Sequence, residues 1–452
     1  MKKKTTRLLL WLISLIVIDY IFHHIKLHQG ISMSLYAIEY SAKYGVIFFL
    51  TLDLFNKKFF DLDLKISAIP IIIILVLFSY HISKRLIAVD KYYYGSKTIT
   101  KKCTPGLWQF DDILGHRGVP NANGAYLYFL GDSIKGQIPV SFDSSGYRIV
   151  PDSLKLTSEK LDLYLGCSCT FGDYVEAEDT FPYLTSKRLD HNYVNAAASA
   201  YGLGQMYYLA HKLISSNAFE YVFIQMSPWL VDRGMNLNGP IFSGCRPFPY
   251  FRAVGDTFQL NPPAFRTSIY SYGEIDWRKS RASYLEKLYF FVSEGFRIQI
   301  LDYYAYKWAV IKIKLGLIPK PTVDDIKLER FVYDKLLDLC YANSATPVLL
   351  KLFYQREECD ELVSYLSDKA MVIDLDEELD RISNFDEDLF KRYFQIYHVQ
   401  GQDTLWYDDH PNPRAHAMFA EKIYDCIGKN FTAEGREHRA QLLKDFTTEN
   451  IP

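Results

Sequence analysis

The sequence lacks paired cysteines, an excess of charge of either sign, internal repeats and low-complexity tracts. Its 7 cysteines are scattered, without the spacing of a zinc site or of a small disulfide scaffold. We therefore expect no metal, and the spacing assigns no disulfide. Lys and Arg number 51 against 53 for Asp and Glu, a formal charge of -2. A chain this close to neutral has no broad attraction for polyanions, which argues against a nucleic-acid partner.

Size and aromatic content leave room for an enzyme. The 452 residues suffice for one large domain together with a membrane region, with ample apolar material for a core. Aromatic residues make up 16% of the chain, including 35 Tyr. This composition suits a protein that lies near an interface or binds sugars or acyl groups, although packed cores also use Tyr and Phe.

The first ninety residues have the composition of a membrane anchor. A basic start, Met1–Arg7, precedes an apolar stretch, Leu8–Phe22, that is interrupted only by Asp19. Ile66–Ser83 carries no charged side chain and is the stronger span. Leu35–Phe55 holds three charged residues and is either a third span or an interfacial helix. We predict two or three transmembrane helices over residues 1–90.

The number of spans decides on which side of the membrane the rest of the chain lies. The basic amino terminus is expected to be cytoplasmic. With three spans everything after residue 84 lies outside, whereas with two spans the basic pair Lys84-Arg85 keeps it inside. We favour an extracytoplasmic location for the remainder of the chain.

From residue 161 onward, short apolar runs alternate with helical stretches, which predicts an α/β domain with a doubly wound parallel sheet. The expected strands are Leu161–Gly166, Tyr193–Ala197, Tyr221–Met226, Pro347–Phe353 and Met371–Leu375. The expected helices are Asp179–Leu189, Leu203–Ser215, Ile326–Ala342, Glu357–Asp368 and Arg414–Ile427. Ligands of such sheets bind outside the carboxyl ends of the strands, so the loops there are the place to look for chemistry.

Two further regions complete the predicted organisation. Residues 91–160 read as a linker and an antiparallel lead-in, with β-like runs at Ala125–Leu130 and Gln137–Phe142. Residues 161–452 form the main domain, with a long insertion at about 232–325. Such an excursion is either a lid or cap over a site, or a packing or membrane-facing accessory.

One candidate nucleophile follows the first predicted strand. Gly166-Cys-Ser-Cys-Thr-Phe-Gly172 places Ser168 between a strand end and the next helix. There its hydroxyl can be exposed while nearby backbone N–H groups point at a developing oxyanion. Taken alone, a serine at a helix start is more often only a cap.

A candidate acid–base pair stands far along the chain in Trp406-Tyr-Asp-Asp-His-Pro-Asn-Pro-Arg-Ala-His416. We expect a turn here, with Asp408 folded back to hold the imidazole of His410 in one tautomer. Asp409 is the alternative carboxylate. By itself such a turn is more often a solvated loop.

Together these segments resemble the SGNH (GDSL-type) hydrolase superfamily over roughly residues 104–430. The first motif of that family is similar to Gly166–Gly172, followed here by Val175-Glu-Ala-Glu-Asp-Thr-Phe-Pro182. Its second resembles Asn195-Ala-Ala-Ala-Ser-Ala-Tyr-Gly202, and its last resembles Asp408-Asp-His-Pro-Asn412. The lead-in Phe142–Arg148 is also similar to the segment that one branch places before its first strand.

The resemblance implies a flavodoxin-like doubly wound sheet and a serine esterase that needs no cofactor. Ser168 would attack an ester carbonyl, His410 would take and return its proton, and Asp408 would orient the imidazolium. The backbone N–H groups of Ser168 and Ala200 would stabilise the oxyanion. Each such donor is typically worth about 3 kcal/mol in the transition state.

Three departures from the family pattern concern the surroundings of Ser168. Cys167 replaces Asp, Ala200 replaces Gly, and the Asn expected after the third strand is absent from Gln225-Met-Ser-Pro-Trp229. Loss of that Asn would cost roughly a hundredfold in rate unless Asn236 or Gln205 substitutes. Trp229 offers a flat wall for a sugar ring or acyl chain.

The cysteines on either side of Ser168, Cys167 and Cys169, are rival nucleophiles, which the family pattern disfavours. His416 reads as a helix-face residue rather than a metal ligand.

Three functions remain open. The first is hydrolysis of an acyl ester on a glycan or lipid near the membrane. The second is transfer of the acyl group to a sugar hydroxyl by the same triad. The third is a non-catalytic binding module that keeps the fold without a full oxyanion hole.

Overall fold

The computed structural model of the protein describes residues 99–104, 106–130, 133–150, 158–241, 244–266, 302–353, 357–383, 395–400 and 403–429. These residues belong to one compact unit, Lys97–Pro452. The expected membrane spans within residues 1–90 lie outside the described ranges. No helix inside those ranges combines the length and the hydropathy needed to cross a bilayer.

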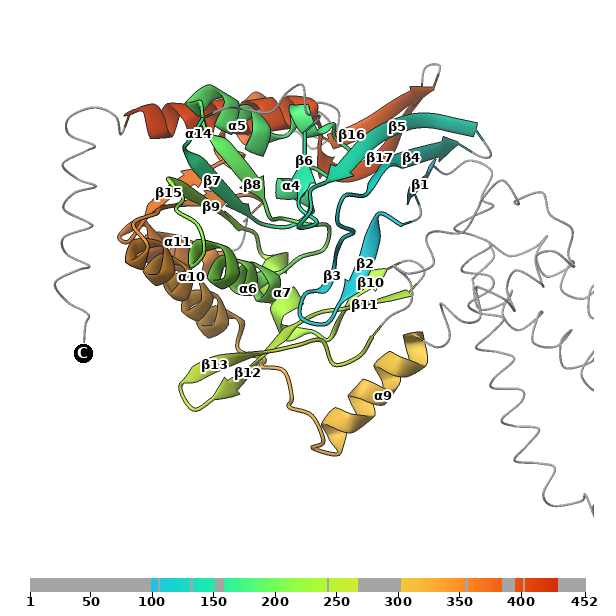
Figure 1. The fold of residues 1–452 in the computed structure, drawn as a ribbon, viewed down its shortest axis with the longest axis vertical. Coiled ribbons are helices and arrows are strands. Elements are labelled where there is room, and N and C mark those ends of the chain that lie inside the picture. The colour runs from blue at the N-terminus through green and yellow to red at the C-terminus, as the bar shows by residue number, and fades with distance from the viewer. Residues whose placement is uncertain are drawn as a thin grey trace, which may run out of the picture. The chain divides into compact units, whose positions relative to one another are not determined.

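Five parallel strands form one side of a nine-stranded sheet, in the order β8-β7-β9-β14-β15, with β15 at the edge (Figure 1). Renumbered by chain position this is 2-1-3-4-5, a doubly wound order. The prediction of a parallel sheet after residue 161 is confirmed, with small shifts at the strand ends. The strands are β7 (Leu161–Leu165), β8 (Asn192–Asn195), β9 (Tyr221–Met226), β14 (Thr346–Lys351) and β15 (Met371–Asp374).

The chain before β7 extends the same sheet with antiparallel strands. Their order is β1-β4-β5-β6, and β6 pairs with β8 through Arg148 and Asn195. The strands are β1 (Ile99–Cys103), β4 (Asn123–Leu130), β5 (Ser133–Phe142) and β6 (Arg148–Ile149). The lead-in segment is therefore continuous with the sheet edge next to β8.

Helices cover both faces of the parallel strands (Figure 1). α5 and α14 pack together on one face, and α6, α10 and α11 lie on the other. Strand order explains this, since right-handed crossovers in opposite directions from β7 place helices on opposite faces. The helices are α5 (Phe181–Leu189), α6 (Leu203–Ile214), α10 (Asp325–Ala342), α11 (Glu357–Ser367) and α14 (Pro413–Lys429).

The main core lies between the sheet and these helices. All six residues of β9 are buried, as are the last four of β7, because helices cover both faces. Core side chains run from Leu107 in the lead-in to Ile427 in α14. Since the sheet pairings and the core of the described residues all fall within Lys97–Pro452, this unit has what it needs to fold by itself.

The insertion after β9 begins with helix α7 (Trp229–Met235) and continues as two hairpins and a longer helix. β10 (Asn238–Ile241) pairs with β11 (Gly244–Pro247), and β12 (Tyr250–Val254) pairs with β13 (Thr257–Asn261). α9 (Asp302–Lys314) packs beside β11. These elements build a second, smaller core around Leu237, Tyr250, Phe265 and Ala309.

The segment expected to be a turn around Asp408 and His410 is a strand, so that prediction was wrong. β16 (Gln395–Gln400) and β17 (Asp403–Pro411) form an antiparallel hairpin, which supplies the backbone hydrogen bonds that a free turn would lack. Its register shifts between the pairs Gln395–Pro411 and Ile396–Asp408. Such a bulge re-aims the residues that it contains, here Asp409 and His410.

Candidate active site

Ser168 lies where the first parallel strand ends. β7 is followed by Gly166 and Cys167, and Ser168 opens the short helix α4 (Ser168–Phe171). Its side chain is buried, with 6% of the residue exposed. A side chain at Gly166 would place its Cβ 2.2 Å from Thr170 Oγ1 and 2.6 Å from Gln225 Oε1, so this turn accepts only glycine.

The Ser168 hydroxyl is hydrogen-bonded to the side chain of the preceding residue, Cys167. Ser168 Oγ donates to Cys167 Sγ at 3.8 Å, and no hydrogen bond to His410 is found within the described part of the chain. Catalytic hydrogen bonds are often long or misaligned before substrate binds, so proton transfer from Ser168 to His410 would need the two side chains to come within hydrogen-bond distance.

Cys167 is the centre of a cluster of donors. Gln225 Nε2 donates to its Sγ at 3.2 Å and Trp229 Nε1 at 3.3 Å. Burial opposes ionisation of the thiol, but the hydrogen bond from Cys169 and the nearby Arg233 outweigh it and hold the pKa of Cys167 well below its ordinary value. The sulfur therefore acts as a buried acceptor, with none of the residue's surface exposed to an ester.

This cluster bears on the missing third oxyanion donor. Gln225 Nε2 also donates to Ser227 Oγ at 2.8 Å, and Gln225 Oε1 accepts from Thr170 Oγ1 at 2.7 Å and from the Cys167 backbone N–H at 3.0 Å. Its amide is thus used within the fold and does not substitute for the absent Asn. Neither does Gln205, whose Nε2 donates to the carbonyl of Leu114 at 3.1 Å.

Asn236 is also engaged elsewhere. Its Nδ2 donates to the backbone carbonyl of Asp232 at the end of α7. Asn236 and Gln205, the two amides expected to substitute for the absent Asn, are therefore both hydrogen-bonded within the fold, as is Gln225.

Ala200 lies in the loop that follows β8. Its φ of 63° is in the left-handed region, where a residue other than glycine is strained. The loop is fixed on both sides: Ser199 O is 2.7 Å from His116 Nε2, and Arg233 Nη1 donates to Tyr201 O at 2.8 Å. No hydrogen bond from the Ala200 N–H to another described residue is found, which leaves that donor available for an oxyanion.

Asn195 links this loop to the nucleophile helix. Its Nδ2 donates to Thr170 O at 3.2 Å, and its Oδ1 accepts from the Ala197 N–H at 3.3 Å. Asn195 therefore holds α4 and the loop after β8 in a fixed relation.

His410 is brought to the nucleophile loop by β17, which packs against α4. Its Nε2 lies 4.0 Å from Asp173 Oδ2, an electrostatic contact that is too long for a hydrogen bond. Asp173 is buried and stands five positions after Ser168, in the loop that follows α4. The backbone of Asp408 lies in β17, while its side chain, like that of Asp409, is outside the described side chains.

Asp173 was missed at the sequence level. A carboxylate soon after the nucleophile reads as a solvated loop residue, because nothing local shows that β17 returns to this point. The only local signal is Gly172, whose φ of 80° ends α4 and turns the chain toward the sheet edge.

The buried Arg148 fixes the loop that carries Asp173. From strand β6 its guanidinium donates to Phe171 O at 2.8 Å, to Gly172 O at 2.5 Å and to Val175 O. Burial lowers the pKa of Arg148, while negative charge nearby, including Asp173, opposes that shift. Tyr126 in β4 donates its hydroxyl to Asp173 Oδ1 at 3.1 Å. The lead-in strands thus help to build the site.

The Pro-Asn pair after His410 has a structural role. Asn412 Oδ1 accepts from the Ala415 N–H at 3.0 Å and caps α14, and its Nδ2 donates to Gln395 O at 3.1 Å. Asn412 therefore joins the β16–β17 hairpin to the helix after it, and so fixes where His410 can lie.

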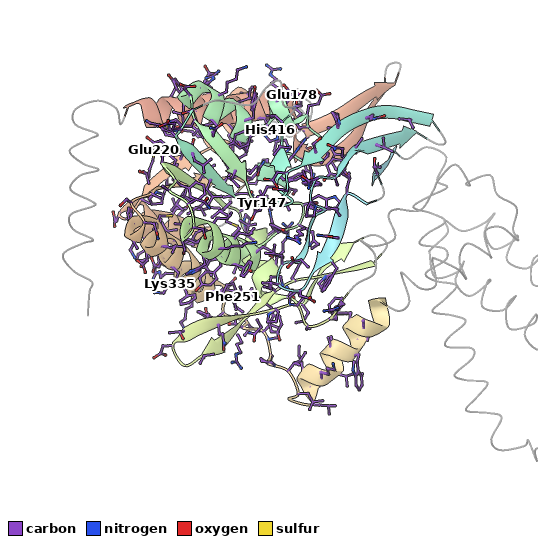
Figure 2. All side chains as sticks on the ribbon, in the orientation of Figure 1. Tyr147, Glu178, Glu220, Phe251, Lys335 and His416 are labelled. Atoms are coloured by element: carbon purple, nitrogen blue, oxygen red, sulfur yellow. The ribbon has the colours of Figure 1, made fainter. Side chains whose placement is uncertain are left out.

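His416 is a buried structural residue, as expected of a helix-face position. It lies between α14 and α5 (Figure 2), where its Nδ1 accepts from the Phe181 N–H at 3.1 Å and its ring stacks on that of Phe181. Burial, then the charges of Arg148 and His410, lower the pKa of His416 to about 3. It is neutral at physiological pH. Among the described residues no group of His, Cys, Asp or Glu is arranged to hold a metal ion.

Trp229 opens α7 beside Cys167 and is half-buried. Its N–H is bound to Cys167 Sγ, and its ring lies 6.1 Å from that of Phe353, tilted by 37°. The hydrogen bond fixes the plane of the indole next to the nucleophile segment.

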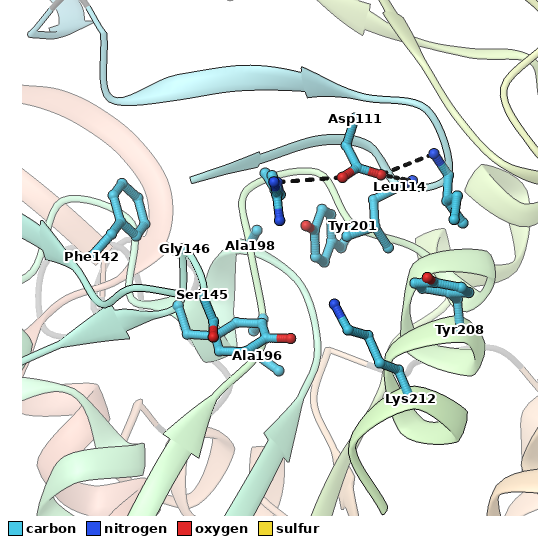
Figure 3. A pocket seen from close by; sticks show the side chains of 14 residues that line it. Asp111, Leu114, Phe142, Ser145, Gly146, Ala196, Ala198, Tyr201, Tyr208 and Lys212 are labelled. Atoms are coloured by element: carbon cyan, nitrogen blue, oxygen red, sulfur yellow. Dashed lines mark hydrogen bonds and ion pairs between the residues drawn. The ribbon is translucent and has the colours of Figure 1, made fainter. Parts of the chain in front are cut away.

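A separate small pocket lies on the lead-in side of the Ala200 loop (Figure 3). It is lined among others by Ala198, Tyr201, Lys212 and Tyr147. Burial and the charge of Asp143 raise the pKa of Tyr147 to about 12, so its hydroxyl stays protonated. Asp111, on strand β2 (Trp108–Asp111), closes one side by accepting from the Leu114 N–H at 2.8 Å.

Comparisons with known proteins give only distant likenesses. No protein-family model matches the chain, and no curated protein matches it. A putative lipolytic protein of the G-D-S-L family from Desulfitobacterium hafniense DCB-2 is 11% identical, with a TM-score of 0.28, and the match covers 59% of this chain and 99% of that one.

Two carbohydrate esterases are similarly distant. A family 2 enzyme from Corynascus thermopiles with a carbohydrate-binding domain is 14% identical with a TM-score of 0.27, covering 73% and 92% of the two chains. A family two enzyme from Cellvibrio japonicus is 12% identical with a TM-score of 0.27, covering 78% and 87%. At these scores the likeness establishes neither fold nor activity.

Proposed function

We propose that the chain is a serine esterase of the SGNH type that hydrolyses an acyl ester on a glycan or lipid near a membrane. One observation carries the proposal. The loop that holds Ser168 and the strand that holds His410, far apart in sequence, come together, with Asp173 Oδ2 4.0 Å from His410 Nε2. The order of the parallel strands and the resemblance of the three motifs support the same function.

In the proposed reaction Ser168 Oγ attacks the ester carbonyl carbon while His410 takes its proton. The carbonyl oxygen becomes an oxyanion, which accepts from the N–H groups of Ser168 and Ala200. Collapse of this intermediate expels the alcohol, which receives the proton from His410. Water then attacks the acyl-serine, with His410 again as base, and releases the acid and free Ser168.

Two carboxylates are candidates to orient His410. Asp408 has the position that the motif implies, and Asp173 is the described carboxylate beside Nε2. An orienting carboxylate acts on the ring nitrogen opposite to the one that faces the serine. Asp408 on Nδ1 therefore leaves Nε2 for Ser168, whereas Asp173 as the partner requires the imidazole to present Nδ1 to the hydroxyl.

Labelling by a serine-directed fluorophosphonate tests the proposal. The Lys97–Pro452 unit should be labelled and should hydrolyse a short-chain nitrophenyl ester. Ser168→Ala should abolish the labelling and lower the rate at least about ten-thousandfold. The control is Ser145→Ala, since Ser145 is exposed in the lead-in. Equal labelling of wild type and Ser168→Ala would exclude Ser168 as the nucleophile.

A second candidate is a non-catalytic binding module. It is favoured by the use of Gln225 within the fold and by the hydrogen bond of Ser168 to Cys167 rather than to His410. An unlabelled wild type that still binds an acylated oligosaccharide in calorimetry would support this function and exclude the esterase.

Acyl transfer uses the same residues and differs only in the acceptor. Adding a sugar acceptor to the hydrolysis assay separates the two reactions. More acylated sugar than free acid would show transfer, whereas free acid as the main product would show hydrolysis. The membrane location of the domain and its extracytoplasmic side remain part of the proposal. Alkaline phosphatase fused after residue 95 should be active if the domain lies outside.

A further inference from the structure

One face of helix α9 in the insertion packs against the rest of the insertion. Ala309 is buried, with 1% of the residue exposed. It packs in the second core with Leu237, Tyr250 and Phe265. The helix neighbours on this face are Ala305, Tyr306, Val310 and Ile313. This packing fixes which side of α9 faces outward.

The outer face of α9 is apolar and exposed. Trp308 is 54% exposed, Ile311 43% and Leu315 64%. Their spacing of three and four residues places them in one stripe along the helix. Leu317 follows at 66% exposed, after Gly316 ends the helix with a φ of 69°. Large apolar side chains grouped in this way mark an interaction surface rather than a solvated one.

Lysines flank this stripe on both sides. Lys307, Lys314 and Lys320 are exposed, and Lys312 is half-buried. Asp302 is the sole acidic residue between positions 302 and 320 of the sequence. Lys312 Nζ lies 6.0 Å from the centre of the Trp308 ring, so its stem follows the apolar stripe while its ammonium lies at the margin. The surface is therefore both apolar and strongly basic.

We propose that this outer face of α9, Trp308, Ile311, Leu315 and Leu317 with the flanking lysines, docks the unit on an anionic phospholipid surface. Apolar side chains would enter the boundary between head groups and acyl chains, and the lysines would lie among the phosphates. Trp308 suits this boundary because its indole is apolar with one polar N–H.

The charge of the surface selects lipid over a second copy of the chain. A symmetric dimer through this face would set the same patch against itself and bring lysines from both copies together. Like charges at that distance repel, whereas anionic head groups neutralise them. The proposal is independent of the chemistry at Ser168 and of the expected spans in residues 1–90.

Vesicle co-sedimentation of the Lys97–Pro452 unit tests the docking directly. The unit should bind vesicles in which about a third of the lipid is phosphatidylglycerol, and should bind pure phosphatidylcholine far less. The double change Lys307→Gln with Lys314→Gln should weaken the binding about twenty-fivefold, since each lysine near an anionic surface contributes about fivefold. Trp308→Ala with Leu315→Ala should weaken it at least about tenfold.

A control comes from exposed positions on another helix. Ile326→Ala with Lys335→Gln changes one exposed apolar residue and one lysine on α10. This variant should bind like wild type, and all variants should keep the wild-type circular dichroism and melting temperature. Equal loss in the α10 variant would show a non-specific charge effect and overturn the proposal.

Tryptophan fluorescence supplies a second readout. The emission of Trp308 is obtained by subtracting the spectrum of Trp308→Phe from that of wild type. On anionic vesicles this emission should shift to shorter wavelength, and bromine-labelled acyl chains should quench it. An unchanged difference spectrum would overturn the proposal, as would equal binding of wild type and the Trp308–Leu315 variant. A third result would also overturn the proposal: wild type that does not bind vesicles but forms a dimer in sedimentation velocity, where the Trp308–Leu315 variant does not dimerise.

Discussion

Ser168 and His410 stand on two parts of the fold that are held in different ways. Ser168 follows a buried parallel strand, and its loop is fixed by Gln225, Asn195 and Arg148 through hydrogen bonds that water does not reach. His410 stands on a two-stranded hairpin, beside a bulge, with its side chain 26% exposed. The position of Ser168 is set by the sheet, whereas the position of His410 depends on how the hairpin packs against it.

This difference indicates that the position of His410 can change more easily than that of Ser168. Two-stranded hairpins are marginal on their own, so the position of β17 depends on α4, on α14 through Asn412, and on the lead-in strand β1. A ligand that completes the site would be expected to move His410 rather than Ser168.

The largest expected effect is on kcat, and it should show which of the carboxylates Asp408 and Asp173 orients His410. If Asp408 orients the imidazole, Asp408→Asn should lower kcat about ten-thousandfold with little change in stability. Asp173→Asn, which keeps the shape of a buried side chain, should then lower kcat far less. Steady-state kinetics on a nitrophenyl ester decide between them. The reverse ranking would assign the orienting role to Asp173 and place Ser168 at Nδ1 of His410.

Loss of Arg148 should destabilise the nucleophile side. Arg148→Met removes the donors to Phe171 O, Gly172 O and Val175 O and leaves buried carbonyls unpaired, which we expect to cost about 3 kcal/mol of unfolding free energy. Urea unfolding of the Lys97–Pro452 unit measures this.

The control for that change is Arg117→Met. The side chain of Arg117 is 35% exposed, and its Nε lies 3.4 Å from Asp111 Oδ2, so its loss should cost less than about 1 kcal/mol. Similar costs for the two variants would mean that the hydrogen bonds of Arg148 do not hold the loop.

Acid should weaken the packing between α14 and α5 through His416. Its pKa is lowered from 6.5 to about 3 in the folded protein, so the native state holds it neutral while the unfolded chain protonates it below about pH 6.5. The stability that this gives is complete above pH 6.5 and is lost as the pH falls toward 3. The expected slope from this residue is about 1.4 kcal/mol per pH unit.

Urea unfolding between those pH values checks the slope. His416→Gln should flatten it, whereas His211→Gln, at an exposed position on α6, should change it much less. An unchanged slope in His416→Gln would show that other groups govern the acid sensitivity.

The smallest effect concerns the cysteine beside the nucleophile. Hydrogen-bond donors and Arg233 hold the pKa of Cys167 well below its ordinary value, while burial raises the pKa of Cys340 to about 12, so the Cys167 thiol should ionise at a lower pH than the Cys340 thiol. In an ultraviolet pH titration, Cys167→Ser should therefore remove the thiolate absorbance that appears at the lower pH, and Cys340→Ser should leave it unchanged. Cys167→Ala, which removes the acceptor of the Trp229 N–H, should release the plane of the indole and raise KM about tenfold. Equal thiolate absorbance in both variants would contradict the donor cluster.

Much of the fold follows from sequence pattern. The strand positions from Leu161 to Leu375 were predicted to within a few residues, because strands buried on both faces are continuous apolar runs and the helices between them are amphipathic. Helices α5, α6 and α14 follow in the same way. The strand β17 was missed, since Trp406–His416 is rich in charge and proline and its pairing partner, β16, gives no local signal.

The site was predictable only in part. The motif around Ser168 and the Pro-Asn pair after His410 are local, and each has a local structural task, a tight turn at Gly166 and a helix cap at Asn412. Asp173 and Arg148 are not local. Arg148 on β6 and His410 on β17 both contact the loop that follows Ser168, although the two strands are far apart in the sequence.

The alternation of strands and helices and the turn at Gly166 follow from local sequence, because hydrophobic period and glycine geometry act within a few residues. The tertiary fold sets the remaining features: the charged groups that face His410, the hydrogen bonds from Gln225 and Trp229 to the sulfur of Cys167, and those from Arg148 that hold the Asp173 loop. These contacts join segments that are distant in the chain, and their energies depend on burial, which no local pattern specifies.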